Sequence, residues 1–344
     1  MKTITKGKNM NNIKKVGLTA LAGSLAAISA NAADLAVSGA SVLTYSQKSD
    51  TEVTGNNYGM KTNISFTGSG EVNGYTVSYM QTSADQFAGM SSARLSVDMG
   101  DMGNISFDQG SGSGLSTIDD KTPTAAEEIW DGLGAKTSVV GGRVGAAGSS
   151  GVFNYVNTFA GVKFNGAFRG GAGASNKDGA TSGAAADNSD AWDFALTTDG
   201  SMLGYEGVTM GAGYGLKETG TAKDTTPQGD DEHMTAFANY SFGGATFGAQ
   251  YSTISKGGVS AIDQEAVRWG LAYNINENLS VSYGESTVEY KHPGASAVDE
   301  DTDGIAVAYT MGSMKLAGNR NQVANLAGAG GSDTSTEIAL SFAF

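Results

Sequence analysis

Cysteine is absent from this 344-residue chain, and proline (3 residues) and histidine (2 residues) are rare. Without cysteine there is neither a disulfide framework nor a thiolate metal site. The two histidines, His233 and His292, lie in no recognisable motif, so the chain offers little material for acid–base or nucleophilic catalysis. Scarce proline, together with 51 glycines, allows frequent turns while the backbone N–H groups stay available for hydrogen bonds between strands.

Long apolar runs are missing as well. Beyond residue 32 no stretch reaches the roughly 18 apolar residues of a membrane-spanning helix, which excludes a helical membrane protein. At the N-terminus, by contrast, five lysines precede a small-residue apolar segment at 16–30, and Ala30-Asn31-Ala32 then supplies the small residues of a cleavage site. This is the layout of a secretory signal peptide. We therefore expect residues 1–32 to be a cleaved signal peptide and residues 33–344 to form the mature domain.

Basic residues are few. The chain has 21 Lys and Arg against 35 Asp and Glu, a net charge of −14. Removing residues 1–32 takes away five lysines and no acid, which leaves 21 − 5 = 16 basic residues and a net charge of 16 − 35 = −19. Such a charge argues against nucleic acid as a partner, because phosphates attract basic proteins. It suits a protein that meets cations.

The C-terminal segment 336–344 alternates strictly. Ile338, Leu340, Phe342 and Phe344 are apolar, and the residues between them are small or charged. A period of two predicts a strand with one apolar face. The same pattern recurs along the chain and predicts an all-β protein of about sixteen strands. We place them near 34–48, 58–68, 73–83, 91–100, 103–110, 151–160, 162–171, 191–199, 206–217, 233–243, 245–255, 265–275, 278–290, 303–311, 314–322 and 336–344.

The connections between these strands alternate between short and long. Seven are tight turns and eight are long; the longest covers 111–150 and the last covers 323–335. This alternation predicts an antiparallel up-and-down barrel with tight turns at one end and loops at the other. Aromatic residues near both ends of the strands fit the two interfaces of a membrane. The alternative is a soluble β-sandwich with an aromatic core.

Strand parity separates the two faces of the predicted barrel. In several predicted strands a cation lies on the face opposite apolar residues, as with Arg94 beside Leu95. A Lys or Arg directed at the middle of the bilayer costs roughly 2–4 kcal/mol, so these cations are expected to face inward. They are Lys61, Arg94, Lys163, Arg169, Arg268 and Lys315. A sixteen-strand barrel with such an interior predicts a water-filled channel.

Taken together, these features resemble the general diffusion porins of Gram-negative bacteria. The resemblance rests on the signal peptide, the strand–turn–strand RLSVDMGDMGNISF at 94–107, the long third loop and the terminal Phe344. It implies a transmembrane barrel in the bacterial outer membrane that lets small hydrophilic solutes and ions diffuse passively. It also implies a homotrimer, joined through small or apolar outward residues of the first and last strands, in contact with outer-membrane lipid and lipopolysaccharide.

In that family the third loop folds into the lumen and opposes acidic to basic side chains. The resemblance implies that the acidic side is drawn from Asp119, Asp120, Glu127, Glu128 and Asp131. It implies that the basic side is drawn from Lys61, Arg94, Arg143, Lys163, Arg169, Arg268 and Lys315. With so few arginines a dense basic ladder is not expected. The alternative for 111–150 is a solvated acidic surface loop.

One segment, Asp299-Glu300-Asp301-Thr302-Asp303-Gly304, begins like a calcium-binding loop. Its twelfth position is Thr310 instead of the bidentate glutamate of such loops, and we expect the segment in a loop between strands. Weak calcium binding by Asp299, Asp301 and Asp303 is one interpretation, and ordinary loop acidity is the other. No cofactor is required.

Three alternatives to a general channel stay open at this stage. A substrate-specific barrel would bind a particular sugar or dicarboxylate. A structural or adhesin barrel would have a plugged interior and would not conduct. An enzyme would use a histidine at the barrel rim, for which neither His233 nor His292 provides a motif.

Overall fold

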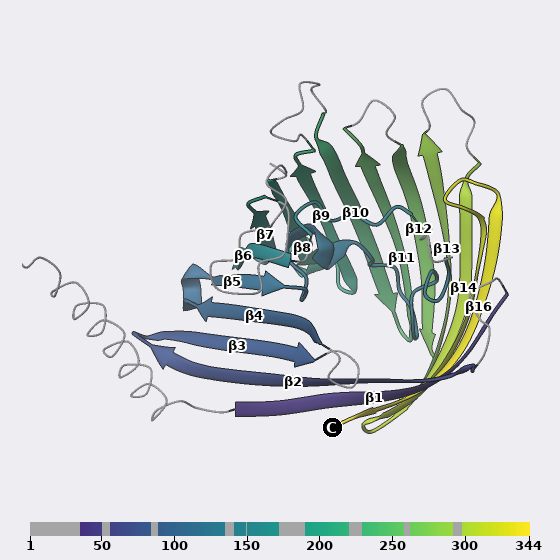
Figure 1. Ribbon diagram of the computed structural model, residues 1–344, viewed down its shortest axis with the longest axis horizontal. Coiled ribbons are helices and arrows are strands. Elements are labelled where there is room, and N and C mark those ends of the chain that lie inside the picture. Colours follow the sequence, from purple (N-terminus) through teal and green to yellow (C-terminus); the bar gives the residue numbers. More distant parts are fainter. Residues whose placement is uncertain are drawn as a thin grey trace, which may run out of the picture.

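In the computed structural model, sixteen antiparallel strands form one closed barrel in chain order, and β1 pairs with β16 (Figure 1). The structure describes residues 35–49, 56–83, 89–134, 141–148, 150–171, 190–219, 229–257, 262–291 and 298–344. The predicted signal peptide lies outside the described residues. No helix within the described part of the chain is both long and apolar enough to cross a membrane.

The strands are β1 (Leu35–Lys48), β2 (Tyr58–Val72), β3 (Tyr75–Ser83), β4 (Met90–Asp98), β5 (Asn104–Gln109), β6 (Ser150–Phe159), β7 (Val162–Arg169), β8 (Ala191–Asp199), β9 (Val208–Lys217), β10 (Asp231–Phe242), β11 (Ala245–Ser255), β12 (Asp263–Asn274), β13 (Leu279–Lys291), β14 (Glu300–Met311), β15 (Met314–Leu326) and β16 (Gly331–Ala343). Within the described residues, short 3-10 helices lie in three connections: η2 (Gly100–Met102), η3 (Gly114–Ile118) and η4 (Gly200–Leu203). The predicted all-β barrel of sixteen strands is confirmed.

One predicted long connection is wrong. β15 continues to Leu326 and β16 begins at Gly331, so the loop expected at 323–335 is a tight turn at 327–330. Asn325 and Ala327 both have φ of 56°, and glycines supply the other left-handed positions of the turn. The sequence concealed these strand ends for two reasons. Residues 331–337 are small or polar on both faces, and the apolar Val323, Ala324 and Leu326 do not alternate with polar residues, so the period-two signal is missing.

Closure of the barrel involves the last residue of the chain. Gly39 N donates to the carbonyl oxygen of Phe344 at 2.7 Å, and Phe344 N donates to the Gly39 oxygen at 3.0 Å. The Phe344 ring lies over Gly39, where a Cβ would be 2.8 Å from Cε2. The seam also pairs Leu43 with Leu340 on the outer face. Phe344 therefore completes the hydrogen-bonded ring.

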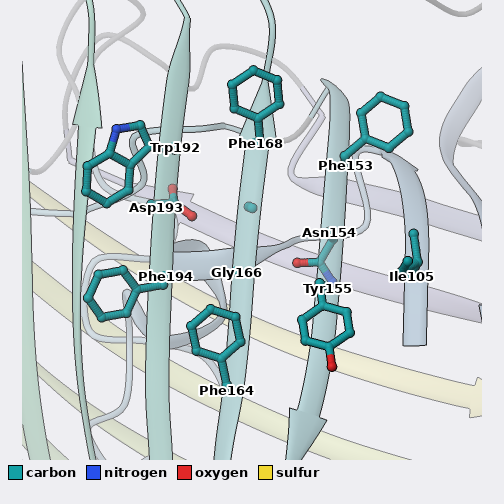
Figure 2. A pocket seen from close by; sticks show the side chains of 11 residues that line it. Ile105, Phe153, Asn154, Tyr155, Phe164, Gly166, Phe168, Trp192, Asp193 and Phe194 are labelled. Carbon is teal, nitrogen blue, oxygen red and sulfur yellow. The ribbon is translucent and has the colours of Figure 1, made fainter. Parts of the chain in front are cut away.

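The two faces of the sheet differ as the alternation predicts. On β8 the rings of Trp192 and Phe194 lie on the outer face, whereas Asp193 between them points to the inside, where it is buried (Figure 2). β6 repeats the pattern, with Phe153 outside and Asn154 inside (Figure 2). The outer rings border a shallow apolar groove over β6, β7 and β8. An apolar outer face and a polar inner face are the arrangement of a membrane barrel.

Charged residues interrupt the outer face of β12, β13 and β14 toward their loop ends. Tyr283 Oη donates to Glu285 Oε1 at 2.6 Å, and Tyr251 Oη bonds to Glu265. Asp303 accepts from Gln322 Nε2 at 2.8 Å. Because uncompensated charge is costly in hydrocarbon, these residues mark the upper limit of the lipid-facing band on this wall.

Substitution of Gly39 tests the closing seam. In Gly39→Val the new side chain would meet the Phe344 ring and the Asn63 carbonyl oxygen, which lies 2.9 Å from an added Cβ. We expect overpacking to lower the free energy of unfolding by about 1–3 kcal/mol, measured by urea titration in detergent. Gly68→Ala is the control, because a Cβ added to Gly68 would lie in open space. Equal stability of the two variants would contradict the role of the seam.

Candidate functional site

The connection between β5 and β6, called L3 here (residues 110–149), runs across the inside of the barrel (Figure 1). Its outbound limb covers residues 110–134 and the described part of its return limb covers residues 141–148. Hydrogen bonds tie both limbs to inward-facing side chains of β7–β16. L3 is therefore a lining of one wall and not an external loop.

The outbound limb begins with η3 packed against the wall. Gly114 N donates to Asn165 Oδ1 at 3.0 Å, and Leu115 N donates to Asp193 Oδ1 at 2.9 Å. Leu115 and Ile118 are fully buried in an apolar cluster whose other members are Val144, Ala195, Phe237 and Ile254. This cluster is a small hydrophobic core inside the barrel, and it fixes the start of L3.

Asp119 and Asp120 follow η3 directly. The wall amide of Gln250 holds this turn, because its Oε1 accepts from Lys121 N at 2.7 Å and its Nε2 donates to the carbonyl oxygen of Ile118 at 2.8 Å. Asp119 is half-buried and hydrogen-bonded to Asp120. Burial, followed by repulsion from Asp120, raises the pKa of Asp119 to about 7.

The far end of the outbound limb carries Glu127, Glu128 and Asp131. Asn321 Nδ2 donates to the carbonyl oxygens of Glu128 and Asp131 at 3.0 and 2.9 Å, which fixes this turn on β15. Glu127 and Asp131 are exposed, whereas Glu128 is half-buried. Although the Glu127 side chain is exposed, partial desolvation of its carboxyl group inside the barrel and the neighbouring carboxylate of Asp131 raise its pKa. Anchoring by backbone carbonyls thus leaves the acidic side chains free to face water.

A water-accessible space of about 450 Å³ lies between the tip of L3 and the wall formed by β1, β2, β15 and β16. Glu127 and Asp131 border it from the loop, and Lys61 and Lys315 border it from the wall. Glu337 joins the wall side and accepts from Ser46 Oγ at 2.7 Å. Acidic and basic side chains therefore line one aqueous space.

The return limb is held by buried charges. Arg268 Nη2 and Nη1 donate to the carbonyl oxygens of Gly141 and Gly142 at 2.8 and 3.0 Å, and its guanidinium lies 4.9 Å from the Trp130 ring centre. Gly141 N donates to Glu300 Oε1 at 3.0 Å. Trp130 belongs to the outbound limb, so Arg268 clamps both limbs to β12.

The other predicted basic residues occupy different places. Arg94 on β4 pairs with Asp108 at 3.4 Å and donates to the Gly112 oxygen at 2.6 Å, so it supports the start of L3. Arg169 on β7 lies beside Gly148 of the return limb, and Lys163 shares its inward face near the tight-turn end. Arg143 belongs to L3 itself and not to the wall.

Comparison with known proteins decides the family. The sequence profile described as "Gram-negative porin" matches residues 17–319, most of the chain. This chain belongs to the Gram-negative porins. A search of curated protein sequences gives no match. Membership in this family, with the closed barrel, makes it an outer-membrane channel protein.

Solved structures share the fold of this porin at low sequence identity. OmpT, an outer membrane protein of Vibrio cholerae, is 13% identical with a TM-score of 0.64 over 90% of this chain and 97% of that one. An anion-selective porin from Comamonas acidovorans is 14% identical with a TM-score of 0.60 over 90% and 99%. OmpT in a trimer form is 14% identical with a TM-score of 0.63 over 90% and 99%.

The predicted loop position of the calcium segment is wrong. Asp301 and Asp303 belong to β14, where their side chains lie on the outer face; Asp301 Oδ1 accepts from Thr287 Oγ1 at 2.9 Å. Consecutive same-face residues of a strand are about 7 Å apart, which does not wrap a cation as a loop does. Among the described residues, no group of three or more His, Cys, Asp or Glu could hold a metal ion. Calcium binding by Asp299, Asp301 and Asp303 remains a prediction.

Sequence reasoning missed several residues of the site. Glu337 was on the polar face of the last predicted strand, so parity could have placed it in the lumen. Asp193 and Glu300 anchor L3, but nothing local in the sequence distinguishes them from ordinary strand acids. Their partners are backbone N–H groups far away in the chain, and only the fold brings these together.

Asp193 links the two limbs of L3, because Oδ1 accepts from Leu115 N and Oδ2 accepts from Ala147 N at 2.8 Å. We expect Asp193→Ala to lower the free energy of unfolding by about 2–4 kcal/mol, since two buried donors lose a charged acceptor. The measurement is urea unfolding in detergent, with protease cleavage within L3 as a second readout. Asp301→Ala, on the outer face, is the control. An unchanged cleavage rate in L3 would contradict this anchoring role.

Proposed function

We propose that this porin is a passive diffusion channel for small hydrophilic solutes and ions, with its narrowest section between the tip of L3 and the wall of β1, β2, β15 and β16. The observation that carries the proposal is the aqueous space shared by Glu127 and Asp131 on one side and Lys61 and Lys315 on the other. L3 covers the opposite wall, so solutes are left with the uncovered side of the barrel. Size exclusion follows from this partial filling.

Charge selection follows from the same side chains. Three carboxylates, of Glu127, Asp131 and Glu337, border the space against the two ammonium groups of Lys61 and Lys315. Opposed charges across a narrow aqueous section create a transverse field that acts on polar solutes. The excess of acid favours cations over anions, in line with the net charge of the chain.

A homotrimer is the proposed assembly. β5 has six residues and β7 has eight, whereas a spanning strand needs about 9–11. Irregular backbone is not tolerated against lipid. The part of the barrel wall formed by the short strands β5 and β7 therefore needs to be covered by another protein surface. The structural similarity to OmpT in its trimer form supports this assembly. Small or apolar outward residues of β1 and β16 remain the predicted contact, and Leu43 and Leu340 are paired residues of this kind. Outer-membrane lipid and lipopolysaccharide would cover the rest.

Catalysis is not part of the proposal. His233 is buried on the inner face of β10, and its Nδ1 accepts from Gly145 N of L3 at 3.3 Å. An imidazole used in this way holds the loop and is not free to act as a base on a solute. His292 lies outside the described residues.

Neutralising the acids of L3 tests charge selection. We expect Glu127→Gln combined with Asp131→Asn to lower the potassium-to-chloride permeability ratio, because two negative charges leave the aqueous space. The reversal potential in asymmetric KCl across a planar bilayer measures the ratio. Lys61→Gln should move the ratio in the opposite direction.

Glu285→Gln is the matched control for the acid variants, because Glu285 is on the outer face of β13. It should leave the reversal potential unchanged. If Glu285→Gln shifts the potential as far as the L3 pair does, the narrow section is not where we place it. If the unaltered protein carries no current, the channel proposal itself fails.

Selectivity should also depend on pH. The pKa of Asp119 is raised to about 7 and that of Glu127 is raised as well, so both carboxyls are more protonated at mildly acidic pH than ordinary carboxyls. L3 therefore gains negative charge as the pH rises from about 6 to 8, and the preference for potassium should increase over this range. Reversal potentials at several pH values measure this change. The increase should shrink in Asp119→Asn, and an equal increase in that variant would refute the assignment.

A further inference from the structure

Four strands on the wall beneath L3 each contribute one glycine to a single lateral row. Gly248 on β11 pairs with Gly270 on β12, which pairs with Gly284 on β13, which pairs with Gly304 on β14. All four are on the inner face. Glycine weakens a strand interior because it adds backbone freedom and no packing. Four in direct register therefore call for a structural reason.

Backbone conformation does not provide that reason. None of the four has a positive φ, although many other glycines of the described chain do. Any residue could adopt the extended conformation at these positions. What glycine supplies here is the absence of a side chain, and with it the close approach of another segment.

That segment is the outbound limb of L3. A Cβ on Gly248 would lie 2.6 Å from Pro123 Cδ, and one on Gly270 would lie 2.7 Å from the Pro123 carbonyl oxygen. A Cβ on Gly284 would be 3.1 Å from Ile129 Cγ2, and also 3.0 Å from the Trp269 carbonyl oxygen of the neighbouring strand. A Cβ on Gly304 would be 3.0 Å from Ile129 Cβ. The row is thus a track with Pro123 over one end and Ile129 over the other.

Asparagines close both ends of the track. Asn239 on β10 pairs with Gly248, and Asn321 on β15 pairs with Gly304. Asn239 Nδ2 donates to the Lys121 oxygen at 2.8 Å, and Asn321 Nδ2 donates to the Glu128 and Asp131 oxygens. In both cases the amide oxygen lies over the neighbouring glycine. The ends therefore hold L3 by its backbone, while the glycines determine how near it lies.

We infer that this glycine track sets how far L3 projects into the barrel, and therefore the cross-section left open beside Glu127 and Asp131. Side chains on the track would lift the segment 123–129 from the wall toward the facing Lys61 and Lys315. The four glycines are positioning residues for the narrow section, although none of them borders the aqueous space. The inference rests on the proposed channel function.

A volume exchange across the contact tests the track. Gly284→Val adds three carbons beneath Ile129, and Ile129→Ala removes three from above. We expect Gly284→Val to lower the single-channel conductance in KCl by about 1.5-fold or more, because L3 moves into the open section. The double variant Gly284→Val/Ile129→Ala restores the total volume and should recover most of the conductance.

Gly318→Val on β15 is the matched control, because a Cβ there has only ordinary contacts, the nearest at 3.7 Å. It should conduct like the unaltered protein. Folding of each variant is checked by the heat-dependent mobility shift of barrels in detergent gels. If Gly284→Val fails to fold, Gly304→Ala beneath the same Ile129 takes its place and should also lower the conductance.

Two results would overturn the inference. In the first, the folded track variant conducts like Gly318→Val. In the second, the double variant stays as low as Gly284→Val alone, which would attribute the loss to a distorted strand and not to L3. Absence of conductance in the unaltered protein is a separate outcome, since it removes the proposed channel function itself.

Discussion

Complete pairing of the backbone polar groups is the constraint on which this structure depends. A strand in hydrocarbon has no water to bond its N–H and C=O groups, so the sheet has to close on itself. Here closure extends to the terminal Phe344, which exchanges two hydrogen bonds with Gly39. Once the ring is closed, the strict alternation along each strand assigns apolar side chains to lipid and polar ones to the interior. The wide, water-filled interior therefore follows from the number of strands.

L3 fills one side of this wide interior and leaves the other side open. Buried charges and amides on β7–β16 hold its backbone, and a row of glycines lets it lie flat against them. The filled side of the barrel resembles the core of a soluble protein, with Leu115 and Ile118 fully buried. The open side keeps the acids of L3 opposite lysines. Packing on one wall is therefore what defines the passage along the other.

The two kinds of cation have separate tasks. Arg94 and Arg268 donate to loop carbonyls, because a planar guanidinium can hold two acceptors in a fixed geometry. Lys61 and Lys315, with mobile ammonium groups, border the aqueous space. The shortage of arginine in the sequence is consistent with this division, since the few arginines that point inward are largely occupied in holding L3. Charge near the passage comes mainly from carboxylates and lysines.

The sequence by itself determined the all-β class, the sixteen strands and the faces of the inward cations, because a period of two is a local property that each strand carries alone. It also pointed to 111–150 as the connection of interest. It failed at the loop ends of β14, β15 and β16, where apolar and polar residues do not alternate, and it counted Arg143 among the basic residues that face L3. The position of L3 against the wall was decided by tertiary structure alone. Asp193 and Glu300 bind backbone N–H groups of L3 that are 46 to 159 residues away in the chain, and the glycine row exists only through the register of four strands. A single sequence contains no local signal for these contacts between L3 and the wall, because the register of the strands is established only when the sheet closes.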